Sequence, residues 1–355
     1  MSVFEARDFD GHETVAFFDN EKAGLKAIIA IHSTALGPAC GGTRMYPYAN
    51  GEEALTDVLR LSRGMSYKSA MAGLPLGGGK AVIIGNPKTD ITEALLLAYA
   101  DAINTLGGHY VTAMDVGIGP KDMPVIARGT KYAAGFDQPG KTGGDSGPAT
   151  TTGVFVGLKA AVKHRLGADT TKGMTVAIQG LGKVGMGLAD ALHKEGAKLL
   201  VSDVNEDAVR AAAERFRAEP LSPDDIVTAD CDVLSPNALG AILNDDTIPK
   251  LKARVIAGAA NNQLGRDEHG EMLKAREILY APDYVINAGG IIRVAGQMND
   301  WNDAEIERRT LAIGATLSAI FARAGRENLP TNIIADRMAR ERIAKGGAKR
   351  IKAAE

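Results

Sequence analysis

The turn at residues 180–185 (GLGKVG) constrains the fold most, because it joins a predicted strand, MTVAIQ, to a predicted helix, MGLADALHKEG. A turn of this composition in this context is typical of a βαβ unit in a parallel sheet. Asp203 ends the next predicted strand, about 20 residues further on, where the dinucleotide-binding fingerprint places an acidic residue. We therefore expect an α/β fold with a Rossmann-type, doubly wound sheet in the second half of the chain.

Each residue of that fingerprint has a physical role in holding a dinucleotide. Gly180 permits the tight turn, Gly182 lets the backbone approach a pyrophosphate, and Gly185 lets helix and strand pack closely. The helix N-terminus offers unpaired N–H groups and a partial positive charge. Asp203 would bind ribose hydroxyls and repel a 2′-phosphate, and Val204 brings no cation. The pattern favours NAD over NADP as the bound nucleotide. The alternative to a nucleotide site is a purely structural βαβ turn.

A second glycine-rich stretch, residues 73–80 (GLPLGGGK), ends in Lys80 and continues as the apolar run AVII. We expect a flexible loop entering a buried strand, with glycines that permit positive φ and close backbone approach. A lysine held there in a partly desolvated cleft has a lowered pKa and can act as a base. The alternative is a solvated lysine on a surface turn. A phosphate loop is excluded, because its first glycine is replaced by Leu74 and its Ser/Thr by Ala81.

The remainder of the first half also alternates between predicted strands and helices. Residues 14–34 indicate a β-hairpin, 52–64 an amphipathic helix, and 110–116 a strand that ends in Asp115, whereas 36–46 is too glycine-dense for a regular element. This alternation predicts a first α/β domain. The segment 137–148 is rich in Gly, Pro, Asp and Ser and marks a linker between two domains.

The overall composition excludes several classes of function. The net charge of −2 over 355 residues gives no argument for nucleic acid or an anionic membrane surface. No apolar run approaches the roughly 20 residues that span a bilayer, and the N-terminus lacks a secretory-signal pattern. Cys40 and Cys231 provide neither a disulfide framework nor metal-ligand spacing. We expect a cytoplasmic protein without a metal, a membrane or a nucleic-acid partner.

A nicotinamide enzyme must also bind a substrate and move protons. The six histidines stand in no setting typical of the 2-hydroxy-acid dehydrogenases, which use one for the proton. The first half instead offers Lys68, Lys80 and Asp115, each beside a strand or a glycine-rich segment. Two neighbouring lysines lower each other's pKa, and a substrate carboxylate together with an aspartate would relieve that repulsion.

Blocks of sequence along most of the chain resemble one enzyme family. They are LGPACGGTRMY, MSYKSAMAGLPLGGGKAVI and YVTAMDVG in the first half, and GDSGPATTTGV, IQGLGKVG, VIAGAANNQL and LYAPDYVINAGG in the second. From about residue 12 to 325 the chain resembles the amino-acid dehydrogenases that act on glutamate, leucine, phenylalanine and valine. Within this family it is most similar to the leucine dehydrogenases, and next to the phenylalanine dehydrogenases.

The resemblance implies reversible oxidative deamination of an L-amino acid to a 2-oxo acid and ammonia. Lys80 would be the general base that activates the attacking water, and Asp115 would transfer protons to and from the amino group. The substrate carboxylate site that it implies comprises Lys68, Gly41, Gly42 and Asn262.

The resemblance also extends the cofactor site beyond the glycine turn, and Asn287 would meet the carboxamide of the nicotinamide. Two of its residues have alternative interpretations, since Thr150 can cap a helix and Gly258 can end a strand. The implied site comprises Gly180, Leu181, Gly182, Lys183, Val184, Gly185, Asp203, Val204, Ser146, Thr150, Ala238, Gly258, Asn261 and Asn287.

In this family a pocket selects the substrate side chain, and the residues of this chain that correspond to that pocket are all uncharged. A glutamate γ-carboxylate would be buried unpaired, which costs roughly several kcal/mol, so glutamate is excluded. Against the usual leucine-enzyme pattern, Cys40 replaces a leucine and Ile291 a valine, and one methylene is worth only about 1–3 kcal/mol. We expect branched-chain aliphatic substrates (leucine, valine, isoleucine), with a phenylalanine dehydrogenase as the alternative. The pocket comprises Cys40, Met65, Ala113, Ile291 and Val294.

Two further classes of function stay open: another nicotinamide enzyme of the hydroxy-acid or malic type, and a catalytically silent NAD-binding regulator. The presence of Lys68, Lys80 and Asp115 together argues against the regulator. The resemblance implies a substrate and oligomerisation domain at 1–138 plus about 325–355, and an NAD-binding domain at 139–324. It further implies an active-site cleft between these domains, and a homo-oligomer.

Overall fold

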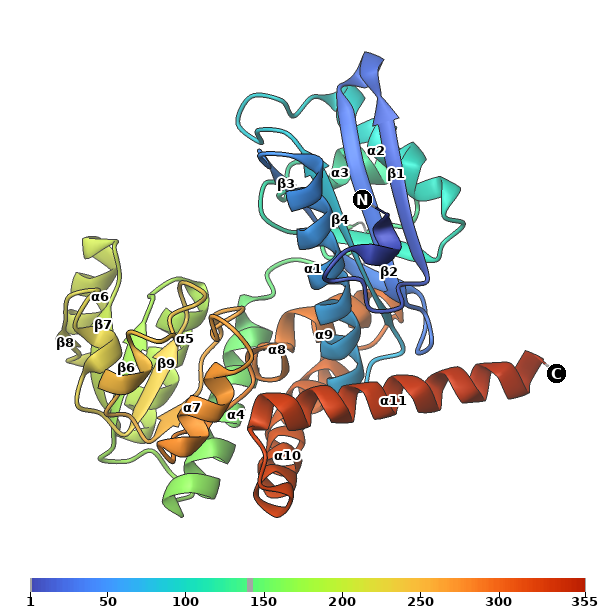
Figure 1. The fold of residues 1–355 in the computed structure, drawn as a ribbon. Coiled ribbons are helices and arrows are strands. Elements are labelled where there is room, and N and C mark those ends of the chain that lie inside the picture. Colours follow the sequence, from blue (N-terminus) through green and yellow to red (C-terminus); the bar gives the residue numbers. More distant parts are fainter. Residues whose placement is uncertain (1, 139–142, 355) are drawn as a thin grey trace. The chain divides into compact units, whose positions relative to one another are not determined.

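The computed structural model describes residues 2–138 and 143–354, and the chain divides into two compact units (Figure 1). The first unit comprises Met1–Asp145, Val294–Trp301 and Ala339–Glu355, and the second comprises Ser146–Arg293 and Asn302–Met338. Each unit has its own sheet with helices packed on it. The expected α/β fold with two domains is therefore confirmed.

The first unit is built on a mixed sheet with the strand order β1-β2-β4-β3-β5. The hairpin of β1 and β2 is antiparallel, as expected for residues 14–34, and β2 also pairs antiparallel with β4. Strand β3 runs parallel to both β4 and β5. The strands are β1 (Thr14–Asn20), β2 (Leu25–Ser33), β3 (Ala39–Tyr46), β4 (Gly77–Ile84) and β5 (Tyr110–Met114).

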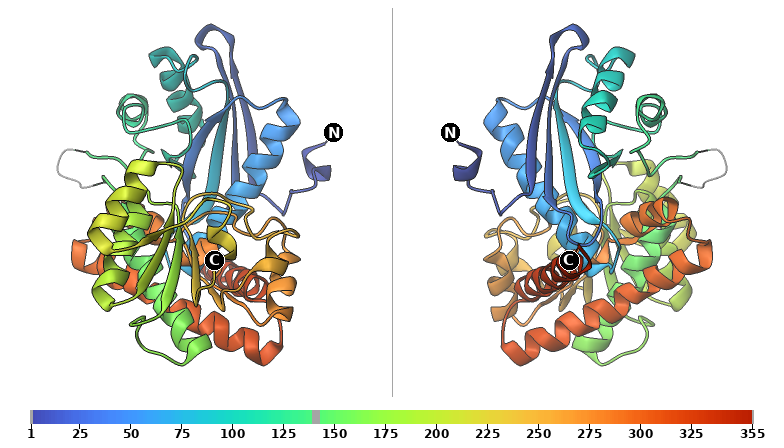
Figure 2. Two further views of the ribbon diagram at one scale, coloured as in Figure 1. Left: turned by 90° about the vertical axis from the view of Figure 1, so that its left-hand side faces the viewer. Right: turned by 90° about the vertical axis from the view of Figure 1, so that its right-hand side faces the viewer.

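Helix α1 (Gly51–Met71) covers one face of this sheet, and α2 (Glu93–Thr105) and α3 (Met123–Gly129) cover the other (Figure 2). The side chain of Asn50 caps α1 by accepting from the Glu53 N–H. On β4, Val82 packs under α1, whereas Ala81 and Ile83 join the core on the opposite side. Because successive strand residues alternate between faces, Lys80 lies on the α1 face with Val82.

Two glycine-rich segments that we expected to be irregular are strands, and this corrects the prediction. Residues 39–46 form β3, and Gly77, Gly78 and Gly79 lie inside β4 with strands paired on both sides. Their backbones are extended, so the predicted flexible loop at Lys80 is wrong. The predicted close approach is confirmed, because a Cβ on Gly78 would overlap the backbone nitrogen and Cα of Ser66 on α1. Glycine is required here by the neighbouring backbone and not by the torsion angles.

The second unit contains a parallel sheet with the order β11-β10-β9-β6-β7-β8. From β6 the chain proceeds to β7 and β8 on one side and then returns to β9 on the other side. Open α/β sheets bind ligands outside the carboxyl ends of the strands at such a switch point. The strands are β6 (Thr175–Gln179), β7 (Lys198–Ser202), β8 (Glu219–Pro220), β9 (Val233–Pro236), β10 (Val255–Ile256) and β11 (Leu279–Tyr280).

The remaining helices include long ones near the C-terminus. None of the helices within 2–138 and 143–354 is long and apolar enough to cross a bilayer. The predicted linker lies partly outside the described residues, and its last residues, Gly147 and Pro148, begin α4. These helices are α4 (Gly147–Leu166), α5 (Lys183–Glu195), α6 (Glu206–Phe216), α7 (His269–Ala275), α8 (Asp283–Ile286), α9 (Gly289–Met298), α10 (Asp303–Glu327) and α11 (Thr331–Ala354), with 3-10 turns at Val3–Glu5, Glu21–Ala23, Ile226–Thr228 and Ile248–Lys250.

The C-terminal part of α11 belongs to the first unit and closes the C-terminus of α1. The Arg342 guanidinium donates to the carbonyls of Ala70 and Met71 at 3.0 and 2.9 Å, and Arg340 donates to the Tyr67 hydroxyl at 2.6 Å. The last carbonyls of a helix have no partner within it and carry partial negative charge, so a guanidinium stabilises them. The end of the chain thereby fixes the end of α1 nearest to Lys68.

Replacing Gly78 by alanine should destabilise the first unit, because the new Cβ would meet the α1 backbone and not a side chain that can move aside. We expect a loss of roughly 2 kcal/mol or more, measured as a lowered urea midpoint. Gly64→Ala is the matched control on α1, where a Cβ meets nothing within 4 Å. It should be neutral or stabilise by about 0.5–1 kcal/mol. Equal midpoints for the two variants would contradict the close-approach interpretation.

Candidate active site

The sheet of the first unit presents a continuous set of predicted site residues on the face that α1 covers. Strand alternation places Cys40, Gly42 and Arg44 of β3 on that face, beside Gly78 and Lys80 of β4. From β5, Ala113 pairs with Gly42, and Asp115 follows two residues later on the same side. Residues that are far apart in the sequence are thus neighbours because three strands run parallel in a fixed register.

Lys80 and Asp115 form a buried ion pair through Lys80 Nζ and Asp115 Oδ2. The lysine is 6% exposed, and its burial lowers the pKa of the amine, although Asp115 partly opposes this shift. Burial alone would raise the pKa of Asp115, but the charges of Lys80 and Arg44 outweigh it and hold that pKa below its usual value. The arrangement therefore contains an ionised carboxylate and an amine that gives up its proton more readily than in water.

Gly41 and Gly42 of β3 leave no room for side chains beside this pair. A Cβ on Gly41 would overlap the Gly79 carbonyl and lie 3.2 Å from Cγ of Met65. A Cβ on Gly42 would overlap the Met114 carbonyl and lie 2.9 Å from Cβ of Asp115. Lys68 lies one turn of α1 beyond Met65 and is half-buried. The structure thus brings the predicted carboxylate-binding glycines next to the predicted catalytic aspartate.

Part of the predicted side-chain pocket also assembles within the first unit. A Cβ on Gly135 would lie 3.4 Å from Cβ of Ala113 and 3.3 Å from Cγ2 of Val294. Cys40 is fully buried on β3, and burial raises the pKa of its thiol to about 12, so the thiol is neutral. These side chains are small and uncharged. Ile291 and Asn262, the other predicted substrate residues, belong to the second unit.

Gln297, which sequence reasoning missed, fixes the backbone beside Val294. Its Oε1 accepts from the Gly135 N–H at 2.6 Å, and its Nε2 donates to the Phe136 carbonyl at 2.7 Å. The side chain lies one turn beyond Val294 on α9 and is 7% exposed. Both hydrogen bonds of this amide therefore hold the segment that forms one wall of the pocket.

In the second unit, the glycine turn between β6 and α5 has the geometry that the fingerprint predicts. Gly180 has φ +91°, and its N–H donates to the Ser202 carbonyl at 2.7 Å. A Cβ on Gly185 would overlap the Gly180 carbonyl, whereas a Cβ on Gly182 would meet nothing within 4 Å. Gly182 is the N-cap of α5 and has no side chain to cap it. The first turn of α5 is therefore an exposed backbone site for an anion.

Asp203, at the end of β7, stabilises the same turn. Its Oδ2 accepts from the Leu181 N–H at 2.6 Å, and its Oδ1 accepts from the Asn205 N–H at 2.8 Å. A carboxylate oxygen has two lone pairs, so these bonds leave further acceptor capacity for ribose hydroxyls. Val204 beside it is 89% exposed, which leaves an apolar side chain at the edge of the predicted site.

A network of amides lies at the ends of β9 and β10. Asn287 Nδ2 donates to the Ala259 carbonyl at 3.0 Å and to Asn261 Oδ1 at 2.7 Å. The Oδ1 of Asn287 is buried and has no hydrogen-bond partner among the described residues. A buried carbonyl without a donor is costly, so this atom is suited to accept from a ligand amide. Ala238, which follows β9, is exposed and lies against Gly180.

The other predicted cofactor residues surround the start of α4 and the end of β10. Thr150 Oγ1 donates to the Ser146 carbonyl at 2.9 Å, so the alternative interpretation of Thr150 as a helix cap is wrong. A Cβ on Gly258 would overlap the Pro236 carbonyl, so this glycine is needed for strand contact. Ser146 and Asn262 are exposed, and Asn262 has φ +53°. Lys183 is exposed and Val184 half-buried in the first turn of α5.

Comparison with known proteins decides the family. Residues 12–132 match the family described as "Glu/Leu/Phe/Val dehydrogenase, dimerisation domain", and residues 143–206 and 199–313 match "Glutamate/Leucine/Phenylalanine/Valine dehydrogenase". The chain belongs to this family. It is therefore an amino-acid dehydrogenase with a Rossmann-type domain.

Its relatives carry the names of several substrates. Leucine dehydrogenase of Geobacillus stearothermophilus is 49% identical over 97% of this chain and 94% of its own length. Valine dehydrogenase of Streptomyces albus is 48% identical over 97% and 95%, respectively. The crystal structure of L-tryptophan dehydrogenase from Nostoc punctiforme superposes with a TM-score of 0.85 at 45% identity, covering 95% of this chain and 97% of that one.

The cofactor of this amino-acid dehydrogenase is NAD, and the second unit fits that cofactor. The open space at Gly182 and the exposed first turn of α5 suit a pyrophosphate. The Asn287 Oδ1, which has no donor among the described residues, suits a carboxamide. Asp203 suits ribose hydroxyls and disfavours a 2′-phosphate.

Sequence reasoning did not find three further residues, Arg44, Asp57 and Tyr48, that are linked to Asp115. Arg44 Nε lies 3.4 Å from Asp115 Oδ2, and its NH1 donates to Asp57 Oδ2 at 2.9 Å. Asp57 Oδ2 also accepts from the Tyr48 hydroxyl at 2.6 Å. The available signal was strand alternation at residues 40, 42 and 44, which required that residues 39–46 first be recognised as a strand.

Replacing Gln297 by methionine should leave the Gly135 N–H and the Phe136 carbonyl buried without a partner. We expect a loss of roughly 2 kcal/mol or more, measured as a lowered midpoint of urea unfolding. Gln138→Met is the matched control, because the Gln138 amide donates to the Ala133 carbonyl through a long, half-buried hydrogen bond of 3.3 Å. Equal midpoints in both variants would show that the Gln297 amide does not hold this segment.

Proposed function

We propose that this enzyme catalyses the reversible, NAD-dependent oxidative deamination of branched-chain aliphatic L-amino acids to 2-oxo acids and ammonia. The observation that carries the proposal is the buried Lys80–Asp115 pair, beside which Gly41 and Gly42 are packed closely against neighbouring backbone. A buried amine whose pKa is lowered can take a proton from water, and a carboxylate held against it can exchange a proton with a substrate amine.

In this proposal, Lys80 is the general base. As a free amine it removes a proton from the water that attacks the imino carbon of the oxidised substrate. Asp115 takes a proton from, or returns one to, the substrate nitrogen as the carbinolamine collapses to the 2-oxo acid and ammonia. NAD, when bound, accepts a hydride from the substrate Cα. Because Asp115 contacts Lys80 directly, protonation of either side chain changes the pKa of the other.

The substrate carboxylate is proposed to bind Lys68, with backbone N–H groups of Gly41 and Gly42 and the amide of Asn262. A carboxylate between Lys68 and Lys80 offsets the repulsion between two ammonium groups. Glycine at 41 and 42 is compatible with this role, because a side chain at either position would overlap neighbouring backbone.

Cofactor binding is proposed to use the backbone of the glycine turn for the pyrophosphate and Asp203 for the adenosine ribose. Asn287 Oδ1 would accept from the carboxamide, and Val204 would contact the adenine side of the nucleotide. The remaining proposed contacts are Leu181, Lys183, Val184, Ser146, Thr150, Ala238, Gly258 and Asn261.

The preference for aliphatic side chains rests on the absence of charge at the residues proposed to contact the substrate side chain, which are Cys40, Met65, Ala113, Ile291 and Val294. Among the relatives, the leucine and valine dehydrogenases fit such a pocket. The small residues Cys40, Ala113 and Gly135 also support a second candidate, an enzyme for aromatic amino acids such as phenylalanine. The relative named L-tryptophan dehydrogenase is compatible with it.

The assembly is proposed to be a homo-oligomer formed through the first unit, because residues 12–132 match a domain described as a dimerisation domain. Light scattering on the purified protein measures its mass directly, and a monomer at working concentration would contradict this.

NADH oxidation with ammonia and a panel of 2-oxo acids tests the proposed substrate. We expect the highest kcat/KM with isobutyl, isopropyl and sec-butyl side chains and a value at least about a hundredfold lower with carboxyethyl, because its charge would be buried unpaired. A benzyl side chain as the best substrate would favour the aromatic candidate. Turnover of 2-hydroxy acids without ammonia, or NADH binding without any turnover, would contradict the proposal.

Lys80→Ala should lower kcat by about a thousandfold or more while NADH binding, followed by its fluorescence, stays unchanged, because the base is lost and the nucleotide site is in the other unit. Lys88→Ala, which removes an exposed lysine just after β4, is the control and should keep wild-type turnover. Wild-type kcat in Lys80→Ala would overturn the assigned role.

A further inference from the structure

Arg44 has an unusual relation to the Lys80–Asp115 pair. Its Nε lies 3.4 Å from Asp115 Oδ2, the same oxygen that contacts Lys80, and this distance exceeds that of an ordinary N–H···O hydrogen bond. The Nε is buried and has no hydrogen-bond partner among the described residues. Asp115 is therefore attracted by two cations, one in contact with it and one slightly farther away, whose buried N–H is a donor without an acceptor among the described residues.

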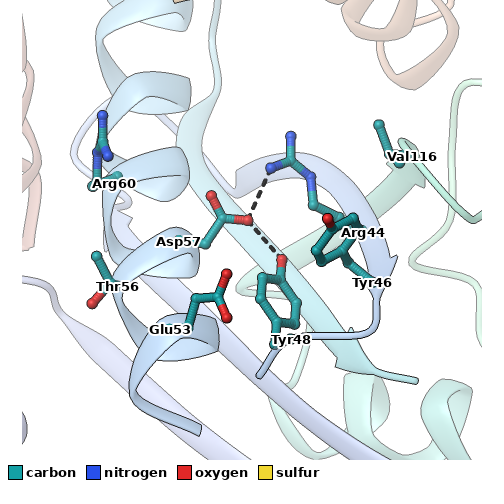
Figure 3. Close-up of a pocket in the computed structure, with 8 residues that line it drawn as sticks. All are labelled: Arg44, Tyr46, Tyr48, Glu53, Thr56, Asp57, Arg60 and Val116. Atoms are coloured by element: carbon teal, nitrogen blue, oxygen red, sulfur yellow. Dashed lines mark hydrogen bonds and ion pairs between the residues drawn. The ribbon is translucent and has the colours of Figure 1, made fainter. Parts of the chain in front are cut away.

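The guanidinium itself is held from the other side. Asp57 on α1 accepts from Arg44 NH1 and from the Tyr48 hydroxyl through one oxygen, as Figure 3 shows. These residues line a cavity of about 490 Å³ on the first unit. The remaining residues of its wall are Tyr46, Glu53, Thr56, Arg60 and Val116. An arginine that is fixed in this way cannot turn away from Asp115 without breaking the bond to Asp57.

We propose that Arg44, anchored by Asp57 and Tyr48, is a positioning residue that holds Asp115 as an ionised carboxylate against Lys80 and so tunes the catalytic base. This inference rests on the proposed role of Lys80. The array runs from Tyr48 to Asp57, Arg44, Asp115 and Lys80, with alternating charge from Asp57 onward. Each charge therefore acts on Lys80 with a sign set by its place in the array.

The surroundings of Lys80 contain few other charges that could mask this effect. Strand β2 faces it with Ala30. His32, further along β2, bonds to Ser66 on α1, and its pKa is lowered to about 4 chiefly by burial, so it is neutral. The charges that act on the pKa of Lys80 are those of Asp115, Arg44 and Asp57, and Lys80 in turn acts on the thiol of Cys40. The elements packed against Lys80 also carry the following charged or titratable residues: Glu52, Glu53, Arg60, Arg63, Tyr67 and Lys68 on α1, Lys26 and His32 on β2, and Tyr46 on β3.

The two outer charges of the array should shift the pKa of Lys80 in opposite directions. The positive charge of Arg44 lowers that pKa and the negative charge of Asp57 raises it. Removing the charge of Arg44 therefore raises the pKa of Lys80, and removing the charge of Asp57 lowers it. General structural damage would reduce the rate in both variants without this opposition of sign.

The experiment compares the acid limb of kcat/KM against pH for deamination in the wild type, Arg44→Gln and Asp57→Asn. The limb should move by roughly one pH unit to higher pH in Arg44→Gln and to lower pH in Asp57→Asn, as expected for charges a few ångströms from the base. Titration of the substrate amine is common to all three proteins and cancels from the differences.

Glu53→Gln is the matched control, because it removes the same charge as Asp57→Asn from the same cavity. Glu53 is exposed and bonds to the Ala49 N–H, so its limb should stay at the wild-type pH. Shifts of the same sign in Arg44→Gln and Asp57→Asn, or no shift in either, would overturn the inference. A wild-type enzyme without turnover, or a limb retained in Lys80→Ala, would instead overturn the proposed function.

Discussion

The close packing of α1 against the centre of the first sheet is the constraint on which the first unit of this enzyme depends. At Gly78 the helix backbone lies where any side chain would stand, and at Gly41 and Gly42 the neighbouring strands and Asp115 do the same. These glycines carry little conformational strain, because β3 and β4 are paired on both sides. Their function is to remove side chains from a surface on which Lys80, Asp115 and the end of α1 must lie close together.

That packing creates the electrostatic problem that the charged residues then solve. A lysine that is 6% exposed is stable only beside a carboxylate, and a carboxylate buried with it needs more positive charge to remain ionised. Asp115 supplies the first requirement and Arg44 the second, and Asp57 keeps Arg44 in place. The result is an alternating array of buried charges, in which the pKa of the Lys80 amine is lowered and Asp115 stays ionised.

The second unit uses backbone geometry where the first uses charge. Its turn is held by Asp203, which bonds to two backbone N–H groups, and the N-terminus of α5 is left without a side-chain cap. The buried Asn287 carbonyl lacks a donor within the described chain. These features leave N–H groups and one C=O available for the polar groups of a dinucleotide, and the switch point of the sheet gathers them at one edge.

The sequence by itself determined the local elements whose signals are local. The glycine turn, its strand, its helix and Asp203 lie close together in the chain, so spacing alone predicted them, and the order of motif blocks predicted the family. The tertiary structure decided what depends on contacts between distant segments. It made strands of two glycine-rich stretches, because pairing on both sides outweighs their weak intrinsic propensity. It also brought Arg44, Asp57 and Gln297 to the site. Strand register and helix packing decide which face of an element meets a remote carboxylate or backbone group, and no single stretch of sequence contains that information.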